Sequence, residues 1–488
     1  MTGASSGLSW TERMVLAAYD GLMQALQPLL RRKLHRRAQQ EPEYGLHVAQ
    51  RFGNYEGESP EGGFVWLHAV SLGETRAAAL LLPALRQAFP GRRLLLTHST
   101  ATGLVQGKAL LQTGDVQAWL PWDTAKATRQ FLRHFNPCIG LLMETEVWPN
   151  LVQACRHAGV PMCLLNARMS EKSSLKALRW PMLSGPAYRG LSLVLAQSAC
   201  DAQRLQRLGC QDVQVVGNLK FDVAVSEQAR MQALRWQGGF AARPVVMLAS
   251  TREGEEALWL QALQSNPARL NQFKSLGVLW LVVPRHPQRF DEVHALVEQA
   301  AWRCERRSAW GDHPPEAARM ARADVVLGDS LGEMQSYYLV SRMALLGGSF
   351  APLGGQNLIE AAACACPIVM GPHTFNFSEA AALAVEQGAA MQVQDMEAAL
   401  GQVAFALAHP EWLDQARNAT VKMLDMGQGA VARHIAALQS MAPMTVTNSP
   451  RDTWAWAPAA VTRSTMAWIW PSLAPSFITI IMVAVSPL

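Results

Sequence analysis

Residues 323–372 read ADVVLGDSLGEMQSYYLVSRMALLGGSFAPLGGQNLIEAAACACPIVMGP, and this stretch decides the fold. Three apolar runs in it, 323–329, 343–349 and 366–372, have the length and the polar endings of buried parallel strands. A short helical pattern fits between each run and the next. The stretch therefore predicts a βαβαβ unit, in which a ligand binds beyond the carboxyl ends of the strands.

The turns after these strands are rich in glycine, so backbone N–H groups there can approach a phosphate. Residues 332–333, 347–349 and 354–357 should line one crevice, with a nucleotide as its occupant. Asn357 and Glu360 are three residues apart at a helix start, so both can face the ribose hydroxyls. The alternative is that the glycines only make tight turns and that Glu360 is a solvated acid.

Composition indicates a globular chain with two ordinary domains, because 488 residues are 50% hydrophobic and 17% charged. The net charge is only +5, but residues 31–37, RRKLHRR, concentrate positive charge beside an apolar segment. That arrangement favours anionic lipid headgroups over nucleic acid as a partner. The 8 cysteines have no paired ligand spacing, so we expect reduced thiols and no zinc site.

Residues 14–30 are apolar and helix-forming, but Asp20, Gln24, Gln27 and Pro28 interrupt them. A clean transmembrane span needs about 20 predominantly apolar residues, so we do not expect one here. The pattern favours a helix lying in the cytoplasmic leaflet, with the arginines of 31–37 on phosphate groups. The alternative is an amphipathic helix packed on the protein.

A second series of strand patterns alternates with helical patterns earlier in the chain, which predicts another parallel sheet. These strands are 64–70, 92–100, 116–121, 138–144, 160–168, 191–198 and 213–219. A polar helical stretch near 223–243 then separates them from new strands at 245–250 and 277–290. The last of these runs ends on the basic residues Arg285, His286 and Arg289, and paired hydrogen bonds from an arginine guanidinium there can hold a phosphate.

Two acids stand out at strand-to-helix junctions of the first series. Glu74 lies in HAVSLGE and Glu144 lies in METEVWPN, with Glu146 two residues later. A helix amino terminus favours the charged carboxylate, so we expect both acids to be ionised at neutral pH and able to take a proton from an attacking hydroxyl. The alternative for either acid is a helix-capping role.

Several blocks together carry a resemblance that no single block would support. HAVSLGE, METEVWPN, LNARMSEKS, VVGNLKFD, LASTREGEE, VPRHPQRF and GGSFAPLGGQNLIEAAA resemble, in this order, the lipid A-specific 3-deoxy-D-manno-octulosonic acid (Kdo) transferases. The resemblance implies the GT-B plan, an α/β fold of two Rossmann-like domains whose parallel sheets face a central cleft. The expected parts are a membrane-associating helix and basic segment at 1–44, an acceptor domain at 45–222, a linker at 223–243, a donor domain at 244–441 and an atypical tail at 442–488.

The resemblance also implies transfer of Kdo from CMP-Kdo to the lipid A precursor lipid IVA, at the cytoplasmic face of the inner membrane. Glu74 would accept the proton of the acceptor hydroxyl, and Glu144 and Lys220 would stabilise the transition state. The residues implied to bind the nucleotide are Pro284, Arg285, Leu331, Gly332, Glu333, Asn357, Leu358, Ile359 and Glu360. No cofactor is expected, and no Asp-x-Asp motif is present, so we expect chemistry without a metal ion.

The sequence departs from the family pattern at Arg252 and Gln356, which stand where the family usually has histidine. An acid or base role for position 356 is therefore not expected. Two rival functions stay open: another GT-B transferase, using a diphosphonucleotide sugar, and an inactive membrane-surface binding protein on the same scaffold. Retention of Glu74, Glu144 and Lys220 argues against the inactive protein.

Overall fold

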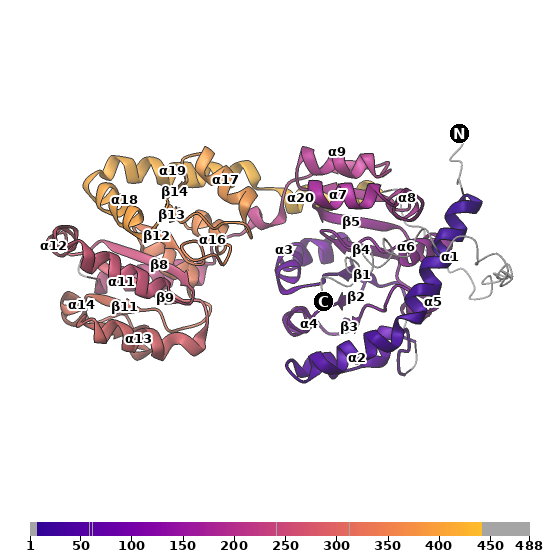
Figure 1. Ribbon diagram of the computed structural model, residues 1–488, viewed down its shortest axis with the longest axis horizontal. Helices are drawn as coiled ribbons and strands as arrows, with labels where there is room; N and C mark the ends of the chain where they lie inside the picture. The colour runs from indigo at the N-terminus through magenta and orange to yellow at the C-terminus, as the bar shows by residue number, and fades with distance from the viewer. Residues whose placement is uncertain (1–6, 58, 61, 241, 312, 442–488) are drawn as a thin grey trace. The chain divides into compact units, whose positions relative to one another are not determined.

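The computed structural model describes residues 7–441 except 58, 61, 241 and 312 (Figure 1). The expected tail at 442–488 lies outside the described residues. The chain forms two compact units. Unit 1 runs to Leu219 and resumes at Gly429, and unit 2 comprises Lys220–Gln428.

Unit 1 contains a sheet of 7 parallel strands in the order β3-β2-β1-β4-β5-β6-β7 (Figure 1). The strands are β1 (Val65–His68), β2 (Leu94–His98), β3 (Val116–Trp119), β4 (Ile139–Met143), β5 (Met162–Ala167), β6 (Leu193–Ala196) and β7 (Val213–Val215). Its helices are α1 (Trp10–Ala25), α2 (Gln27–Ala38), α3 (Leu72–Ala88), α4 (Ala101–Lys108), α5 (Ala125–Phe135), α6 (Pro149–His157), α7 (Glu171–Leu178), α8 (Pro181–Arg189), α9 (Ala199–Arg207) and α20 (Ala430–Ser440). All the strands predicted for the first domain are confirmed.

Unit 2 repeats this plan with 7 parallel strands in the order β10-β11-β9-β8-β12-β13-β14. The strands are β8 (Val245–Thr251), β9 (Leu279–Pro284), β10 (Cys304–Arg306), β11 (Val325–Leu327), β12 (Met343–Leu346), β13 (Ile368–Met370) and β14 (Ala390–Gln392). Its helices are α10 (Glu227–Gly239), α11 (Glu255–Ser265), α12 (Pro267–Ser275), α13 (Phe290–Gln299), α14 (Ala317–Arg322), α15 (Met334–Val340), α16 (Leu358–Ala363), α17 (Ser378–Glu386), α18 (Met396–Ala408) and α19 (Pro410–Gly427). The βαβαβ unit predicted for 323–372 is β11-α15-β12-α16-β13.

The central strands of both sheets are buried on both faces, because their alternate residues enter different cores. In β1, Trp66 belongs to the core cluster that includes residues of α5, α6 and α9, whereas Val65 and Leu67 belong to the cluster that includes residues of α3 and α20. This double burial explains why the strands read as continuous apolar runs.

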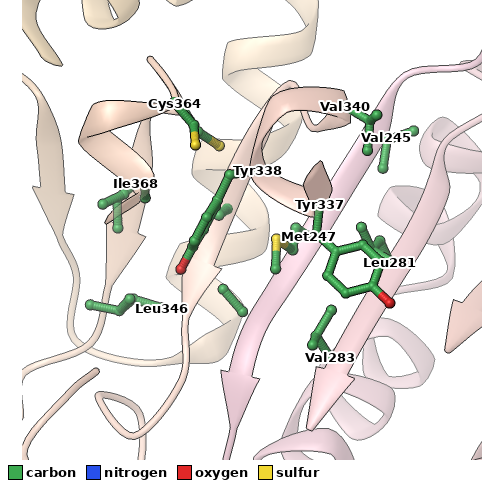
Figure 2. Packing of buried hydrophobic residues seen from close by; sticks show 14 of the residues in the cluster. Val245, Met247, Leu281, Val283, Tyr337, Tyr338, Val340, Leu346, Cys364 and Ile368 are labelled. Carbon is green, nitrogen blue, oxygen red and sulfur yellow. The ribbon is translucent and has the colours of Figure 1, made fainter. Parts of the chain in front are cut away.

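In unit 2, two consecutive tyrosines of α15 enter the core over the sheet. Figure 2 shows the ring of Tyr337 on the side of Leu281 and Val283 and that of Tyr338 on the side of Leu346. Both tyrosine side chains are 2% exposed, so α15 is fixed to the sheet by large aromatic surfaces. This packing positions the turn that precedes α15, which carries predicted nucleotide contacts.

The observed division differs from the predicted boundaries at two places. Residues 223–243 were expected to be a linker, but α10 packs on α15 and buries Trp236, so it belongs to unit 2. Residues up to 441 were expected in the donor domain, but α20 packs on the first sheet through Leu438. Arg433 Nε of α20 also donates to Val216 O over 2.8 Å, which fastens this helix to unit 1.

The N-terminal helices α1 and α2 each bury one side against unit 1. Tyr19, Met23, Leu30 and Leu34 enter a core cluster, and Asp20 Oδ1 accepts the N–H of Ala125 over 2.7 Å. Among the described residues, no helix is both long and apolar enough to cross a membrane. The burial of one side of α1 agrees with the alternative given for 14–30, an amphipathic helix packed on the protein. The other side of α1 is exposed.

Candidate functional site

Strand order locates one candidate site in each unit. In an open parallel sheet, ligands bind where neighbouring strands send their connections in opposite directions. In unit 1 that switch point lies between β1 and β4, and in unit 2 it lies between β8 and β12. Glu74 follows β1 and Glu144 follows β4, so the structure brings these two predicted acids to one switch point.

The backbone around Glu74 explains how its carboxylate is held. Ser71 caps α3, and Glu74 is the third residue of the helix. Glu74 Oε2 accepts the N–H of Val70 over 2.8 Å, and Ser71 Oγ donates to Glu74 Oε1 over 3.4 Å. The side chain therefore bends back across the turn between strand and helix, which is the capping geometry that the alternative reading named.

The protonation state of Glu74 corrects the sequence-based expectation. Burial, helped by the negative charges of Glu144 and Glu146, raises the pKa of Glu74 to about 8, against the lowering effect of the Val70 and Ser71 hydrogen bonds. The expected stabilisation by the helix terminus does not dominate, because desolvation disfavours the charged form more strongly. At pH 7 the carboxyl group of Glu74 is mostly protonated.

The acids after β4 sit in a strained turn, in which Glu144 is partly buried and Glu146 is buried. Glu144 adopts a left-handed backbone with φ 57°, an uncommon conformation for a residue with a side chain. Its N–H donates to Leu165 O and its carbonyl accepts from Arg168, so β5 fixes this turn. Burial raises the pKa of Glu146 to about 7, although its carboxylate accepts the indole N–H of Trp148 over 2.8 Å.

Two buried histidines that the sequence reading assigned no role support the same edge of the sheet. His68 Nδ1 lies 2.9 Å from Thr97 Oγ1, and His98 Nδ1 lies 2.9 Å from Ala69 O and 3.4 Å from Thr75 Oγ1. Burial lowers the pKa of His68 to about 3 and that of His98 to about 4, so both rings are neutral. Their strand-end positions were visible in the sequence, but their hydrogen-bond partners were not.

Lys220, the third residue assigned to catalysis, is the first residue of unit 2. The segment before it is anchored to unit 1, because Asn166 Oδ1 accepts the N–H of Leu219 over 3.0 Å and Asn218 Nδ2 donates to Gln197 Oε1 over 2.9 Å. Lys220 therefore stands where the chain passes from unit 1 into unit 2.

In unit 2, two of the residues predicted to bind the nucleotide lie at the carboxyl end of β9, the strand next to β8. Pro284 ends β9, and the N–H of Arg285 donates to Thr251 O over 2.9 Å. The Arg285 side chain is exposed. A guanidinium so placed can reach a phosphate, as the sequence reading expected.

An ion pair between Glu333 and Arg307 fixes the turn at 331–333. Glu333 Oε1 accepts from Arg307 over 2.7 Å and from Gln232 over 2.5 Å, and Tyr337 donates to Oε2 over 3.2 Å. The carboxylate of Glu333 is thus committed to protein contacts. What this turn offers a ligand is Leu331, which is 75% exposed, and backbone at Gly332.

In the segment 357–360, some side chains are buried in the core and others are accessible to a ligand. Asn357 is exposed and caps α16, with its Oδ1 accepting the N–H of Ile359 over 3.1 Å. Leu358 and Ile359 are 0% and 1% exposed, so their side chains belong to the core and offer a ligand only backbone atoms. Glu360 is partly buried in the first turn of the helix.

Among the described residues, no group of three or more His, Cys, Asp or Glu side chains is arranged to hold a metal ion. The cysteines there are free thiols, as expected from their spacing. The predicted charged groups at these strand ends are the carboxylates of Glu74 and Glu144 in unit 1 and the guanidinium of Arg285, after β9, in unit 2.

Comparison with known proteins connects this geometry to a family. Residues 46–223 match the family model described as 3-deoxy-D-manno-octulosonic-acid transferase (kdotransferase). A 3-deoxy-D-manno-octulosonic acid transferase of Bordetella pertussis is 43% identical over 433 residues, which cover 86% of this chain and 98% of that protein. The transferase of Haemophilus influenzae is 31% identical over 431 residues, covering 86% and 97%.

A solved structure with a TM-score above 0.5 gives a matching result for the fold. A putative UDP-N-acetylglucosamine 2-epimerase from Listeria monocytogenes is 14% identical, covers 78% of this chain and 96% of its own, and has a TM-score of 0.51. The C-terminal CMP-Kdo binding domain of WaaA from Acinetobacter baumannii is 31% identical, covering 40% of this chain and 97% of its own, with a TM-score of 0.35. The fold is GT-B, and the chain belongs to the family of 3-deoxy-D-manno-octulosonic acid transferases.

Proposed function

We propose that this Kdo transferase moves Kdo from CMP-Kdo to lipid IVA, the assignment that the sequence resemblance implied. The observation that carries the proposal is the pair of acids at the switch point of unit 1, where the charge of Glu144 raises the pKa of Glu74. A carboxyl group with a pKa near the working pH is suited to accept and return a proton.

The proposed reaction uses Glu74 as the base. Its ionised form takes the proton of a glucosamine hydroxyl of the acceptor while that oxygen bonds to the anomeric carbon of Kdo. The bond between that carbon and the phosphate oxygen breaks, and CMP leaves. Glu144 and Lys220 stabilise the charge that develops in the transition state, as the resemblance implies.

We propose that unit 2 holds the donor. Arg285 is exposed at the end of β9, where its guanidinium would bind the single phosphate of CMP-Kdo. Leu331, Gly332, the backbone of Leu358 and Ile359, and Asn357 and Glu360 complete the proposed nucleotide contacts. A cationic side chain and backbone N–H groups suffice for a single phosphate, so the proposal needs no metal ion.

The proposed location is the cytoplasmic face of the inner membrane. The side of α1 and α2 that faces away from unit 1 exposes Trp10 by 73% and Leu29 by 61%, together with Arg32 and Arg36. The neighbouring helix α8 exposes Met182, whose Sδ lies 4.0 Å from Thr11 Oγ1. Exposed apolar and cationic side chains on these helices suit an interface of anionic lipid headgroups.

A transfer assay tests the proposal. Full-length protein, CMP-Kdo and lipid IVA should give a product heavier than lipid IVA by Kdo units, which mass spectrometry counts. In a parallel thermal-shift experiment CMP should raise the melting temperature and UDP should not. A shift with UDP alone would favour a transferase that uses a diphosphonucleotide sugar, and CMP binding without product would favour the inactive binding protein.

A further inference from the structure

The side chain of Glu255 crosses the switch point of unit 2. Glu255 begins α11 directly after β8 and is 1% exposed. Its Oε2 accepts the N–H of Gly348 over 2.7 Å, and its Oε1 accepts those of Phe350 over 3.0 Å and Ala351 over 3.3 Å. Oε2 also accepts the N–H of Arg252 over 2.9 Å, so one carboxylate joins the loops after β8 and β12.

Converging backbone N–H groups of this kind form a site for an anion, and here the chain supplies the anion itself. The sequence predicts that the glycines at 347–349 present their N–H groups to a phosphate. The N–H of Gly348 is instead bound by Glu255. The loop is thus shaped by an internal carboxylate before any donor arrives.

The shape of this loop extends to the segment that should contact the nucleotide. Gly348 has φ 70°, and its carbonyl accepts the N–H of Gly355 over 2.7 Å. A Cβ at Gly348 would lie 3.1 Å from Gln356 Nε2. Because Asn357 follows directly, the backbone held by Glu255 sets where the first residues of α16 lie.

We propose that Glu255 is a positioning residue for donor binding. It fixes the loop after β12, and through that loop the segment at 354–357, in the conformation that receives the nucleotide, and it does not itself touch the donor. This inference rests on the proposed function, in which unit 2 binds CMP-Kdo.

The test compares variants of the full-length protein by calorimetry with CMP and by steady-state kinetics. Glu255→Gln keeps the size of the side chain but turns an acceptor into an N–H donor that faces other N–H groups. CMP affinity should fall about 10-fold or more, because hydrogen bonds to a charged acceptor are lost. The KM for CMP-Kdo should rise with it, whereas kcat at saturating donor should stay close to the wild-type value.

Rescue of CMP affinity by an added carboxylate distinguishes loss of the Glu255 carboxylate from a general loosening of unit 2. Glu255→Ala removes the carboxylate and the methylene next to it, and acetate has the same two carbons. Added acetate should restore much of the CMP affinity of Glu255→Ala and leave wild-type affinity unchanged. If Glu255→Gln does not fold, Glu255→Asp, which keeps the charge on a shorter chain, should show a smaller loss of CMP affinity than Glu255→Ala.

Arg243→Met is the matched control for stability. Arg243 also joins loops of unit 2, because it donates to the carbonyls of Gly277, Val278, Met320 and Ala323, but these lie before the amino ends of β9 and β11. This variant should lower the melting temperature without changing CMP affinity.

Three outcomes are distinguishable. Wild-type CMP affinity in Glu255→Gln, or an equal loss in Arg243→Met, would overturn the positioning role. Absence of CMP binding by the wild-type protein would instead overturn the proposed function, on which this role depends.

Discussion

In the proposed mechanism Glu74 is the base, and its surroundings set its protonation state. A base must be ionised to act, so a folded-state pKa of about 8 means that the active fraction of Glu74 grows as the pH rises toward and past that value. The same burial makes the base stronger once it is ionised. The negative charges of Glu144 and Glu146 are part of the cause, which makes the pH dependence adjustable by mutation.

Glu146→Gln should move the rising limb of kcat/KM to lower pH. Removing the negative charge of Glu146 lowers the pKa of Glu74, while the carbonyl oxygen of glutamine can still accept the indole N–H of Trp148. The measurement is a pH–rate profile for wild type and variant on the same acceptor. An unchanged limb would mean that Glu74 is not the group that titrates.

Arg285→Ala and Glu333→Gln should have different effects, the first on CMP binding and the second on the stability of the fold. Arg285 is exposed, so its loss should weaken CMP about 10-fold with little change in melting temperature. Glu333 is bound to Arg307, so its change should lower the melting temperature because a partly buried charge loses its partner. Calorimetry and thermal unfolding on both variants give the comparison, and equal behaviour would refute the separation.

Residue positions were more predictable from the sequence than residue states. Glu74 and Glu144 were located correctly at strand ends, because strand patterns and polar stops are local signals. The raised pKa of Glu74 was not predictable, since it depends on burial and on charges that the fold brings near. Glu255 stood in the quoted block LASTREGEE, but its partners at 348–351 come from another strand–loop crossing.

At the scale of elements, the N-terminal helices have two different sides. The buried side of α1 and α2 places Tyr19, Met23, Leu30 and Leu34 in the core of unit 1. Deleting residues 1–37 would therefore damage the fold as well as any membrane contact. Substitutions on the exposed side test membrane binding without disturbing that core.

Replacing Arg32 and Arg36 with glutamine should weaken binding to anionic vesicles. Each cation near an anionic surface contributes about 1 kcal/mol, so the double variant should lose roughly 30-fold in affinity at low salt. Activity on vesicle-embedded lipid IVA should fall more than activity on detergent-dispersed lipid IVA. Unchanged vesicle binding would contradict the proposed surface, and neutral vesicles provide the control.

Long elements with clear periodicity were predicted well, but the sheet on which a helix packs was not always predicted. The strands β10 and β14 were missed because their residues, CER and AMQ, do not form an apolar run, whereas the equally short β11 and β13 read VVL and IVM. The helix α20 was assigned to the wrong unit by continuity along the chain, because an apolar stripe does not say which sheet it will cover. Its contact with Val216 and with the core of unit 1 is a tertiary property.

At the scale of the whole molecule, two units of similar plan hold different chemistry. The switch point of unit 1 carries carboxylates suited to proton transfer, and that of unit 2 carries a glycine-rich loop held by a buried carboxylate, with Arg285 at the neighbouring strand end. Lys220 stands where the chain enters unit 2. The expected consequence is a division of work, with acceptor activation in unit 1 and donor binding in unit 2.

The most direct test of this division is one variant measured in two ways. Glu74→Gln should lower the rate of Kdo transfer to lipid IVA by about 10²–10⁴-fold, the usual contribution of a general base. CMP affinity of the same protein sample should stay at the wild-type value, because the change lies in unit 1. Transfer at more than half the wild-type rate, or a matching loss of CMP affinity, would contradict the assignment of Glu74 as the base and the division between the units.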